Sequence, residues 1–169
     1  LIFDPFAGSC VVEVCCHKLQ RRFIGCEINK EYFEKGSNEG EATVVGSASI
    51  LGGNLIIPES VFYDGKTYKV TQIAARAFLS KKLLTSITIP ESVTSIGLWA
   101  FANCDNVTTL TAPGNCIQYF LNFPKLKSLT ILGDVSSQIG QLNQDKTLKT
   151  VTIKDATLIC DDAFCGCSS

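Results

Sequence analysis

The sequence predicts a mainly β solenoid with short helical turns over residues 39–169, preceded by a small β-α-β fragment over residues 1–38. Two observations predict the solenoid: a phrase ending in alternating apolar residues and threonine occurs four times, and an Ala-Phe pair occurs three times. A third observation predicts the fragment, because a turn that contains glycine follows a short apolar run close to Leu1. The two parts share no pattern, so we expect two unrelated segments that join near Gly36 to Gly40.

The composition bounds the size and class of the protein. Its 169 residues allow one ordinary domain, or one small domain and a fragment. Apolar residues make up 46% of the chain and charged residues 18%, which is enough apolar material for a packed core. Fifteen basic and sixteen acidic residues leave a net charge of −1, which excludes the basic field that non-specific nucleic-acid binding requires. Because the sequence starts at Leu1 and stops within a repeat, we expect a fragment cut at both ends.

The N-terminal segment has the element order strand, tight turn, helix, strand. We expect a strand at residues 1–3, a turn at 4–9, a helix as far as Leu19 and a strand at 23–26, followed by Glu27. This order matches part of a doubly wound fold, in which a glycine admits a cofactor to the backbone and an acidic residue about 20 positions later binds ribose. Glycine turns between a strand and a helix are also common without a cofactor, so the spacing leaves both interpretations open.

The residues of this segment resemble a known cofactor motif. Asp-Pro-Phe-Ala-Gly-Ser at 4–9 and Lys-Leu-x-Arg-Arg-Phe-Ile-Gly-x-Glu-Ile-Asn-x-Glu-Tyr at 18–32 closely resemble the S-adenosylmethionine-binding motif of the DNA adenine/cytosine amino-methyltransferases. The resemblance covers residues 1–35 and implies part of a Rossmann-like methyltransferase fold. It also implies that Glu27 holds the ribose of the cofactor and that four turn residues line it, namely Asp4, Phe6, Gly8 and Ser9.

Two departures from that motif bear on activity. Cys10, Val11 and Val12 stand where the resembled family has a glycine and two threonines, and a side chain at the glycine would crowd the backbone approach to the cofactor. The chain also contains no Asp/Asn-Pro-Pro-aromatic loop to hold the flipped base. We therefore expect a remnant without catalytic residues or bound cofactor. S-adenosylmethionine and DNA become ligands only if a functional methyltransferase part exists in a longer chain.

Residues 41–169 are organised by a repeat. Residues 41–73 contain two predicted strands, 42–45 and 69–73, and we expect them to cap the array. The repeated phrase then starts at Leu84, Val107, Leu126 and Leu148, at intervals of 23, 19 and 22 residues. Each copy ends in alternating apolar residues and threonine, which is the pattern of a strand with one buried face. Units of this size cannot bury their own apolar face, so they stack and form continuous ladders.

The segments between these strands are predicted to turn and coil. Pro90 and Pro113 follow two of the strands and cannot continue a central ladder, so they mark turns. Residues 96–104 have apolar residues at helix-like spacing for one or two turns, which predicts a short coil or helix. Residues 113–148 lack the Ala-Phe pair and have a shorter repeat, so we expect one or two irregular turns there.

The recurring letters resemble a second known family. Leu-Thr-Ser-Ile-Thr-Ile-Pro-Glu-Ser-Val-Thr-Ser-Ile-Gly at 84–97, followed by Ala-Phe-x-x-Cys, strongly resembles the BspA-like leucine-rich repeat family of bacteria. The resemblance implies a surface or secreted adhesion role in which the repeat face binds a protein or a cell-surface ligand. Ile-Pro-Glu-Ser-Val at 57–61 repeats the phrase at 89–93 and agrees with it.

Nine cysteines raise the questions of metal binding and disulfides. Their odd number and irregular spacing argue against a disulfide framework, and neighbouring cysteines on a helix point too far apart to close on one metal. We expect no metal site and a ladder of buried thiols that includes Cys104 and Cys167. Two long uncharged stretches, 42–58 and 106–124, are interrupted by Gly, Asn, Thr and Pro, so we expect no membrane span.

Three functional interpretations remain. The first is a protein-interaction or adhesion module that carries a non-catalytic remnant. The second is a fragment of a DNA amino-methyltransferase fused to a repeat array, and the third is a chimeric reading frame without a selected function. The repeat array favours a surface or secreted location and the methyltransferase motif a cytoplasmic one, so the compartment stays open. Because about three quarters of the chain is repeat, the first interpretation is favoured.

Overall fold

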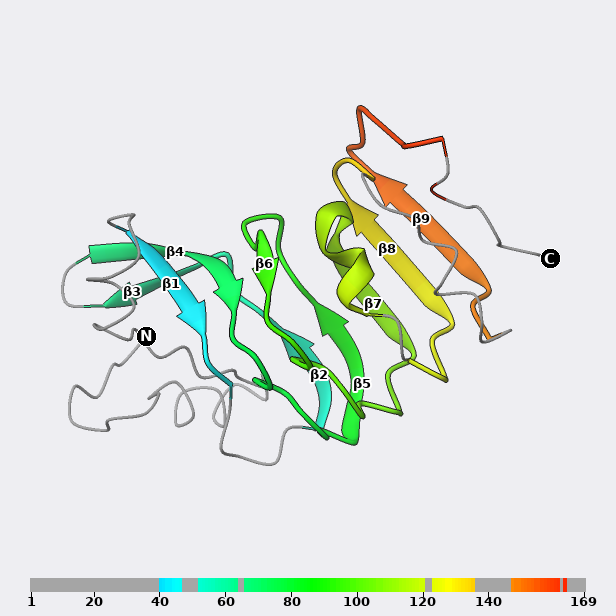
Figure 1. The fold of residues 1–169 in the computed structure, drawn as a ribbon, viewed down its shortest axis with the longest axis horizontal. Coiled ribbons are helices and arrows are strands. Elements are labelled where there is room, and N and C mark those ends of the chain that lie inside the picture. Colours follow the sequence, from blue (N-terminus) through cyan, green and yellow to red (C-terminus); the bar gives the residue numbers. More distant parts are fainter. Residues whose placement is uncertain are drawn as a thin grey trace.

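The computed structural model describes residues 40–46, 52–63, 66–120, 123–135, 147–161 and 163. The β-α-β fragment predicted over residues 1–38 lies outside the described residues. Two sheets and a short 3-10 helix account for the regular structure of the described part (Figure 1). The elements are β1 Glu41–Val44, β2 Gly52–Ile56, β3 Ser60–Tyr63, β4 Lys66–Ile73, β5 Leu83–Thr88, β6 Ser95–Ile96, β7 Thr109–Pro113, η1 Gly114–Tyr119, β8 Ser128–Leu132 and β9 Thr150–Lys154.

The larger sheet is parallel and contains one strand from each repeat. Its order is β2-β5-β7-β8-β9, so consecutive repeats lie side by side (Figure 1). The four predicted threonine-containing strands are confirmed as β5, β7, β8 and β9. The sheet keeps its register between β5 and β9 although the repeat interval changes from 23 to 19 and then 22 residues. The difference in length is therefore taken up elsewhere in the repeat.

One row of residues on the inner face of this sheet forms the predicted apolar ladder. Ile87 pairs with Leu110, which pairs with Leu129, and all three are fully buried. Val151 is next in the row and is 38% exposed, because β9 is the last strand of the described sheet. Each inner residue therefore depends on a neighbouring repeat on both sides for its burial.

The smaller sheet is built around the long strand β4. Its first half pairs antiparallel with β3, and its second half pairs parallel with β1 and β6. The predicted strands at 42–45 and 69–73 are confirmed as β1 and β4, whereas β2 and β3 were not predicted. Val44, Ile73 and Ile96 lie in register and are buried, so this sheet forms a second apolar ladder facing the same core.

The short coil or helix predicted at residues 96–104 is coil in the structure, without a helical turn. Ile96 belongs to β6, and the residues that follow form consecutive turns. Trp99 and Asn103 have positive φ angles of 58° and 59°, and a right-handed helix cannot contain such residues. The preceding repeat has the same geometry 23 residues earlier, at Arg76 and Ser80.

Backbone hydrogen bonds in these turns alternate between two directions. The amides of Arg76, Phe78 and Ser80 donate to carbonyls of the next repeat, at Leu98, Ala100 and Ala102, over 2.7–3.0 Å. The intervening amides of residues 77, 79 and 81 donate to carbonyls three positions back in their own repeat, over 3.2–3.3 Å. Both sets of amides are thereby satisfied without a helix.

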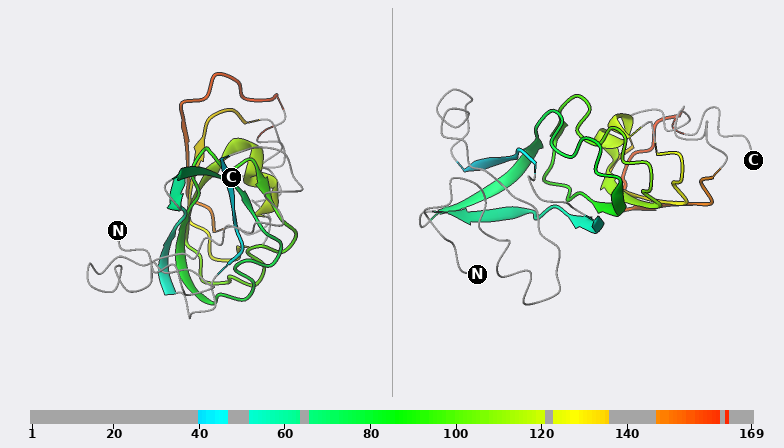
Figure 2. Two further views of the ribbon diagram at one scale, coloured as in Figure 1. Left: turned by 90° about the vertical axis from the view of Figure 1, so that its left-hand side faces the viewer. Right: turned by 90° about the horizontal axis from the view of Figure 1, so that it is seen from below.

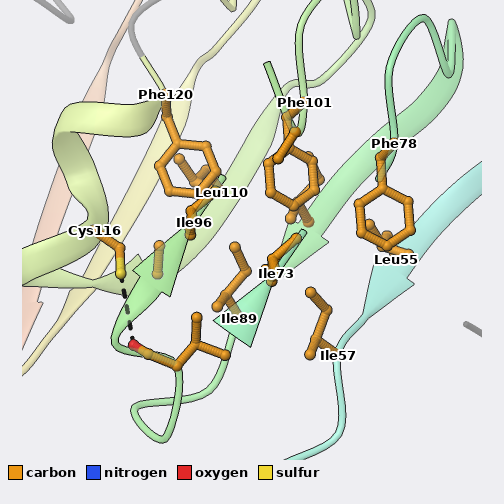
Figure 3. Packing of buried hydrophobic residues seen from close by; sticks show 14 of the residues in the cluster. Leu55, Ile57, Ile73, Phe78, Ile89, Ile96, Phe101, Leu110, Cys116 and Phe120 are labelled. Carbon is orange, nitrogen blue, oxygen red and sulfur yellow. Dashed lines mark hydrogen bonds between the residues drawn. The ribbon is translucent and has the colours of Figure 1, made fainter. Parts of the chain in front are cut away.

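Irregular turns were expected between Pro113 and Leu148, and η1 confirms one of them. Residues 136–146 lie outside the described part, so the rest of this expectation is untested. The helix stands where the preceding repeat has its turns, and Phe120, which follows it, continues the row of repeat phenylalanines. The ring of Phe101 lies 5.1 Å from that of Phe78 and 5.4 Å from that of Phe120 (Figure 3). This row and the apolar ladders belong to one continuous core.

The two sides of the stacked repeats differ in structure. Strands of the larger sheet follow one side, whereas turns and η1 follow the opposite side (Figure 2). We call the two sides the sheet side and the turn side.

Gly97 lies where two repeats approach closely. Its amide donates to the carbonyl of Ile73 over 2.7 Å, and a Cβ at this position would collide with the backbone nitrogen of Ala75.

Candidate interaction surfaces

The predicted cofactor residues lie outside the described residues. They are Asp4, Phe6, Gly8, Ser9 and Glu27, and the departures at 10–12 share this segment. The surfaces that the structure does describe belong to the repeats, where the sequence predicts a binding face without specifying its residues.

The turn side carries an exposed patch formed by Arg76, Leu98 and Trp99, which we call the Trp99 patch. Leu98 is 73% exposed and Trp99 60% exposed. The amide of Arg76 donates to the carbonyl of Leu98 over 3.0 Å, and the Arg76 guanidinium carbon lies 5.0 Å from the centre of the Trp99 ring. The indole thus lies at the surface with a cation stacked on it, although a ring of this size is usually largely buried.

The backbone at Trp99 is strained. A left-handed conformation brings Cβ too close to a carbonyl oxygen and costs about 1–2 kcal/mol for a residue other than glycine. The patch contains two such residues, since Arg76 has a φ of 61° and Trp99 a φ of 58°. The same conformation recurs at Ser80 and Asn103, so the strain belongs to the backbone of the repeat, where bonds between repeats maintain it.

The sequence contains one pattern that indicates this patch. The residue before each Ala-Phe pair is Arg76, Trp99 or Asp162, so this position varies inside an otherwise regular motif. The only tryptophan of the chain stands there. The apolar spacing of residues 96–104 does not distinguish this position from its buried neighbours, whereas the structure leaves Trp99 60% exposed.

The outer face of the larger sheet carries two rows of hydroxyl side chains, which we call the hydroxyl ladder. Their residues are paired in register on neighbouring strands and are half-buried or exposed. One row is Ser86, Thr109, Ser128 and Thr150, and the other is Thr88, Thr111, Thr130 and Thr152. The prediction that threonine lies on the outer face of each strand is thus confirmed.

Basic residues line the edge of this sheet at which its strands begin. Lys82, Lys127 and Lys149 immediately precede β5, β8 and β9, and Lys125 lies nearby; all four are exposed. We call these four residues the lysine rim. The strand starts lie along the lower right side of the sheet in Figure 1. Asp105 is the acidic residue of this edge within the described part of the chain.

The predicted ladder of buried thiols is confirmed for Cys104, while Cys167 lies outside the described residues. Cys104 Sγ donates to the carbonyl of Phe78 over 3.2 Å. Cys116 Sγ donates to the carbonyl of Val93 over 3.5 Å (Figure 3). Burial raises the pKa of both thiols to about 11, so both stay protonated at neutral pH. Neither is suited to act as a nucleophile or metal ligand, because both roles require the thiolate.

Two further observations concern the described residues only. Their His, Cys, Asp and Glu side chains include no group of three or more placed to hold a metal ion. Their helical segments include none long and apolar enough to cross a membrane.

Asp134 joins two repeats through its carboxylate. Oδ1 accepts hydrogen bonds from the amides of Thr157 and Leu158 over 2.7 and 2.8 Å, and from the Thr157 hydroxyl over 3.0 Å. Hydrogen bonding from Leu158 and then from Thr157 lowers the pKa of Asp134 below its ordinary value of 3.8. Sequence patterns did not single out this residue, because its partners lie 23 and 24 positions away.

Comparisons with known proteins agree with the arrangement of the repeats. Residues 56–169 match the sequence model described as "BspA type Leucine rich repeat region (6 copies)", and residues 1–38 match one described as "DNA methylase". No curated protein matches the chain.

Three solved structures are similar to the chain. A leucine-rich repeat protein from Bacteroides capillosus is 23% identical with a TM-score of 0.45, over 77% of this chain and 93% of that protein. One from Bacteroides ovatus is 18% identical with a TM-score of 0.44, over 84% of this chain and 43% of that one. A leucine-rich cell surface protein from Faecalibacterium prausnitzii is 19% identical with a TM-score of 0.37, over 85% and 50%.

Proposed function

Because the chain belongs to the BspA-type leucine-rich repeat family, we propose that it is an adhesion-type protein-interaction module. In this proposal its repeats stack as a solenoid, and the Trp99 patch binds a protein partner. The module acts at the cell surface or after secretion, where a partner on another cell or in the surrounding medium can reach the repeats.

The exposed, strained tryptophan carries the proposal. Binding energy at protein interfaces is concentrated in a few residues, among which Trp and Arg are enriched. Trp99 is 60% exposed and stacks with Arg76, so both side chains are already held in place before a partner arrives. Less conformational entropy is then lost on binding. Leu98, which is 73% exposed, adds apolar area beside them.

Trp99→Gly tests this proposal without disturbing the fold. Glycine adopts a φ of 58° freely, which relieves about 1–2 kcal/mol of strain. The lost cation–π contact offsets about 0.5–1 kcal/mol of that gain. Asn103→Gly is the matched control, since Asn103 has a φ of 59° but lies outside the patch.

The three proteins would be used as immobilised baits for a detergent extract of surface proteins, with quantitative mass spectrometry. We expect a protein that wild type and Asn103→Gly retain equally, and that Trp99→Gly retains at least tenfold less. Equal retention by all three baits would disprove a role for the patch, and melting curves would confirm that each bait is folded.

A second candidate function follows from the match of residues 1–38 to a DNA methylase model. A longer protein could methylate DNA with S-adenosylmethionine bound at Asp4, Phe6, Gly8, Ser9 and Glu27. Those residues lie outside the described part, and the substitutions at 10–12 remove a glycine and two hydroxyls from the motif. We propose that the present chain does not use this cofactor.

Isothermal titration calorimetry tests this second candidate. We expect no measurable heat of S-adenosylmethionine binding, because about forty residues cannot form the remaining strands of the cofactor domain. Tight binding that disappears in the Glu27→Ala variant would instead favour the methyltransferase.

A further inference from the structure

The lysine rim contains neighbouring like charges that no described acidic residue pairs with. The amide of Lys149 donates to the carbonyl of Lys127 over 2.8 Å, so these two lysines begin adjacent strands and lie one strand apart. Like charges on neighbouring strands destabilise a sheet. Lys125 Nζ donates to Asn106 Oδ1 over 2.6 Å, and Asn106 Nδ2 donates to the carbonyl of Lys82 over 2.7 Å, so a neutral side chain links these two rim lysines. The rim thus concentrates positive charge in a chain whose net charge is −1.

The rim also borders the hydroxyl ladder. Lys127 directly precedes β8, which carries Ser128 and Thr130. Lys149 directly precedes β9, which carries Thr150 and Thr152. Each hydroxyl can donate and accept a hydrogen bond, and the rows repeat every ~4.8 Å across the strands. At the opposite end of the sheet, Glu91, Asp134 and Asp155 follow β5, β8 and β9, and Lys154 is the one exposed lysine that the described residues of these three strands place there.

From this placement we propose that the lysine rim and the adjoining hydroxyl ladder bind a linear anionic polysaccharide lying across the strands. The lysines pair with its sulfate or carboxylate groups, and the hydroxyl rows bond its sugar hydroxyls. Nucleic acid is the less suitable polyanion, because the outer strand positions carry Ser and Thr, and single-stranded nucleic acid requires aromatic side chains on which bases stack. This surface is on the sheet side, so the proposal does not depend on the Trp99 patch.

Fluorescence anisotropy with labelled dextran sulfate, polygalacturonate and neutral dextran tests the proposal. We expect binding of at least one of the two anionic polymers, weakening as salt increases, and none of dextran. The first two polymers distinguish sulfate from carboxylate recognition. Failure of both to bind would overturn the proposal. So would a DNA duplex or single strand of equal charge that binds as tightly as the better polysaccharide.

Two sets of variants locate the site. Lys127→Gln/Lys149→Gln should weaken binding at least tenfold and reduce the salt slope by about two, one counterion for each lost contact. Lys66→Gln/Lys69→Gln removes the same charge from exposed residues of β4, in the other sheet, and should change affinity less than twofold. Equal losses in the two pairs would show a general charge effect and refute the assigned surface.

Thr130→Val/Thr152→Val tests the hydroxyl ladder, because valine keeps the shape and β-propensity of threonine and removes its hydroxyl. We expect a two- to fivefold loss of affinity with an unchanged salt slope. Unchanged affinity would remove the ladder from the proposal and overturn it in the form stated.

Discussion

The sheet side and the turn side of each repeat meet different structural demands. On the sheet side, Thr88, Thr111 and Thr130 occupy equivalent positions on neighbouring strands. On the turn side, Arg76 and Trp99 occupy equivalent positions and share a positive φ, but one side chain is a cation and the other an aromatic ring. Strand pairing therefore enforces uniformity on the sheet side. On the turn side, backbone hydrogen bonds between repeats maintain the path of the chain, so the side chains can vary.

The largest effect should come from the phenylalanine row, where the two sides share a core. Phe101→Ala removes a ring that is 4% exposed and lies between Phe78 and Phe120, so we expect a loss of about 3–5 kcal/mol in unfolding free energy. Leu98→Ala, at 73% exposed, is the control and should change it by less than about 0.5 kcal/mol. Urea denaturation measures both, and similar losses would contradict the assignment of inner and outer residues.

A smaller loss is expected where the turn side is tightly packed. Gly97→Ala places a methyl group against the backbone nitrogen of Ala75, and the repeats cannot separate without weakening the bond from Gly97 to Ile73. Overpacking of this kind costs about 1–3 kcal/mol. Thermal melting should therefore show a lower midpoint, whereas an unchanged midpoint would mean that the turn side yields more easily than its bonding suggests.

The smallest effect should be the pH dependence of the bridge at Asp134. The folded pKa of this carboxyl is lowered, so its stabilising contribution is complete above the unfolded value of 3.8 and is lost as pH falls through the folded value. We expect Asp134→Asn to melt at a lower temperature than wild type at pH 7. The difference should shrink below pH 3.8. A difference independent of pH would show that the amide replaces the carboxylate fully.

The sheet side could be predicted because its chemistry is periodic. Alternating threonine and apolar residues located β5, β7, β8 and β9 and indicated the buried face of each strand. β2 was missed because Gly52-Gly53-Asn54 has low strand propensity, and its pairing with β5 supplies what the local sequence lacks.

The turn side could not be predicted in the same way. Turns with a left-handed residue at every fourth position bury Ala100, Phe101 and Cys104 at the spacing that a helix would also produce. Periodicity therefore cannot separate the two structures. The direction of Trp99 follows from its φ, which a sequence pattern does not encode when the residue is not glycine or asparagine. The Asp134 bridge depends on contacts between repeats and was equally hidden.

The alternating hydrogen bonds of the turn side also have a kinetic consequence. The amides of residues 77, 79 and 81 are held within one repeat, so opening a single turn exposes them to solvent. The amides of 76, 78 and 80 are held by the next repeat, so their hydrogens exchange only when two repeats separate. Hydrogen exchange at neighbouring residues of one short segment thus reports on two different motions: the opening of a single turn and the separation of two repeats.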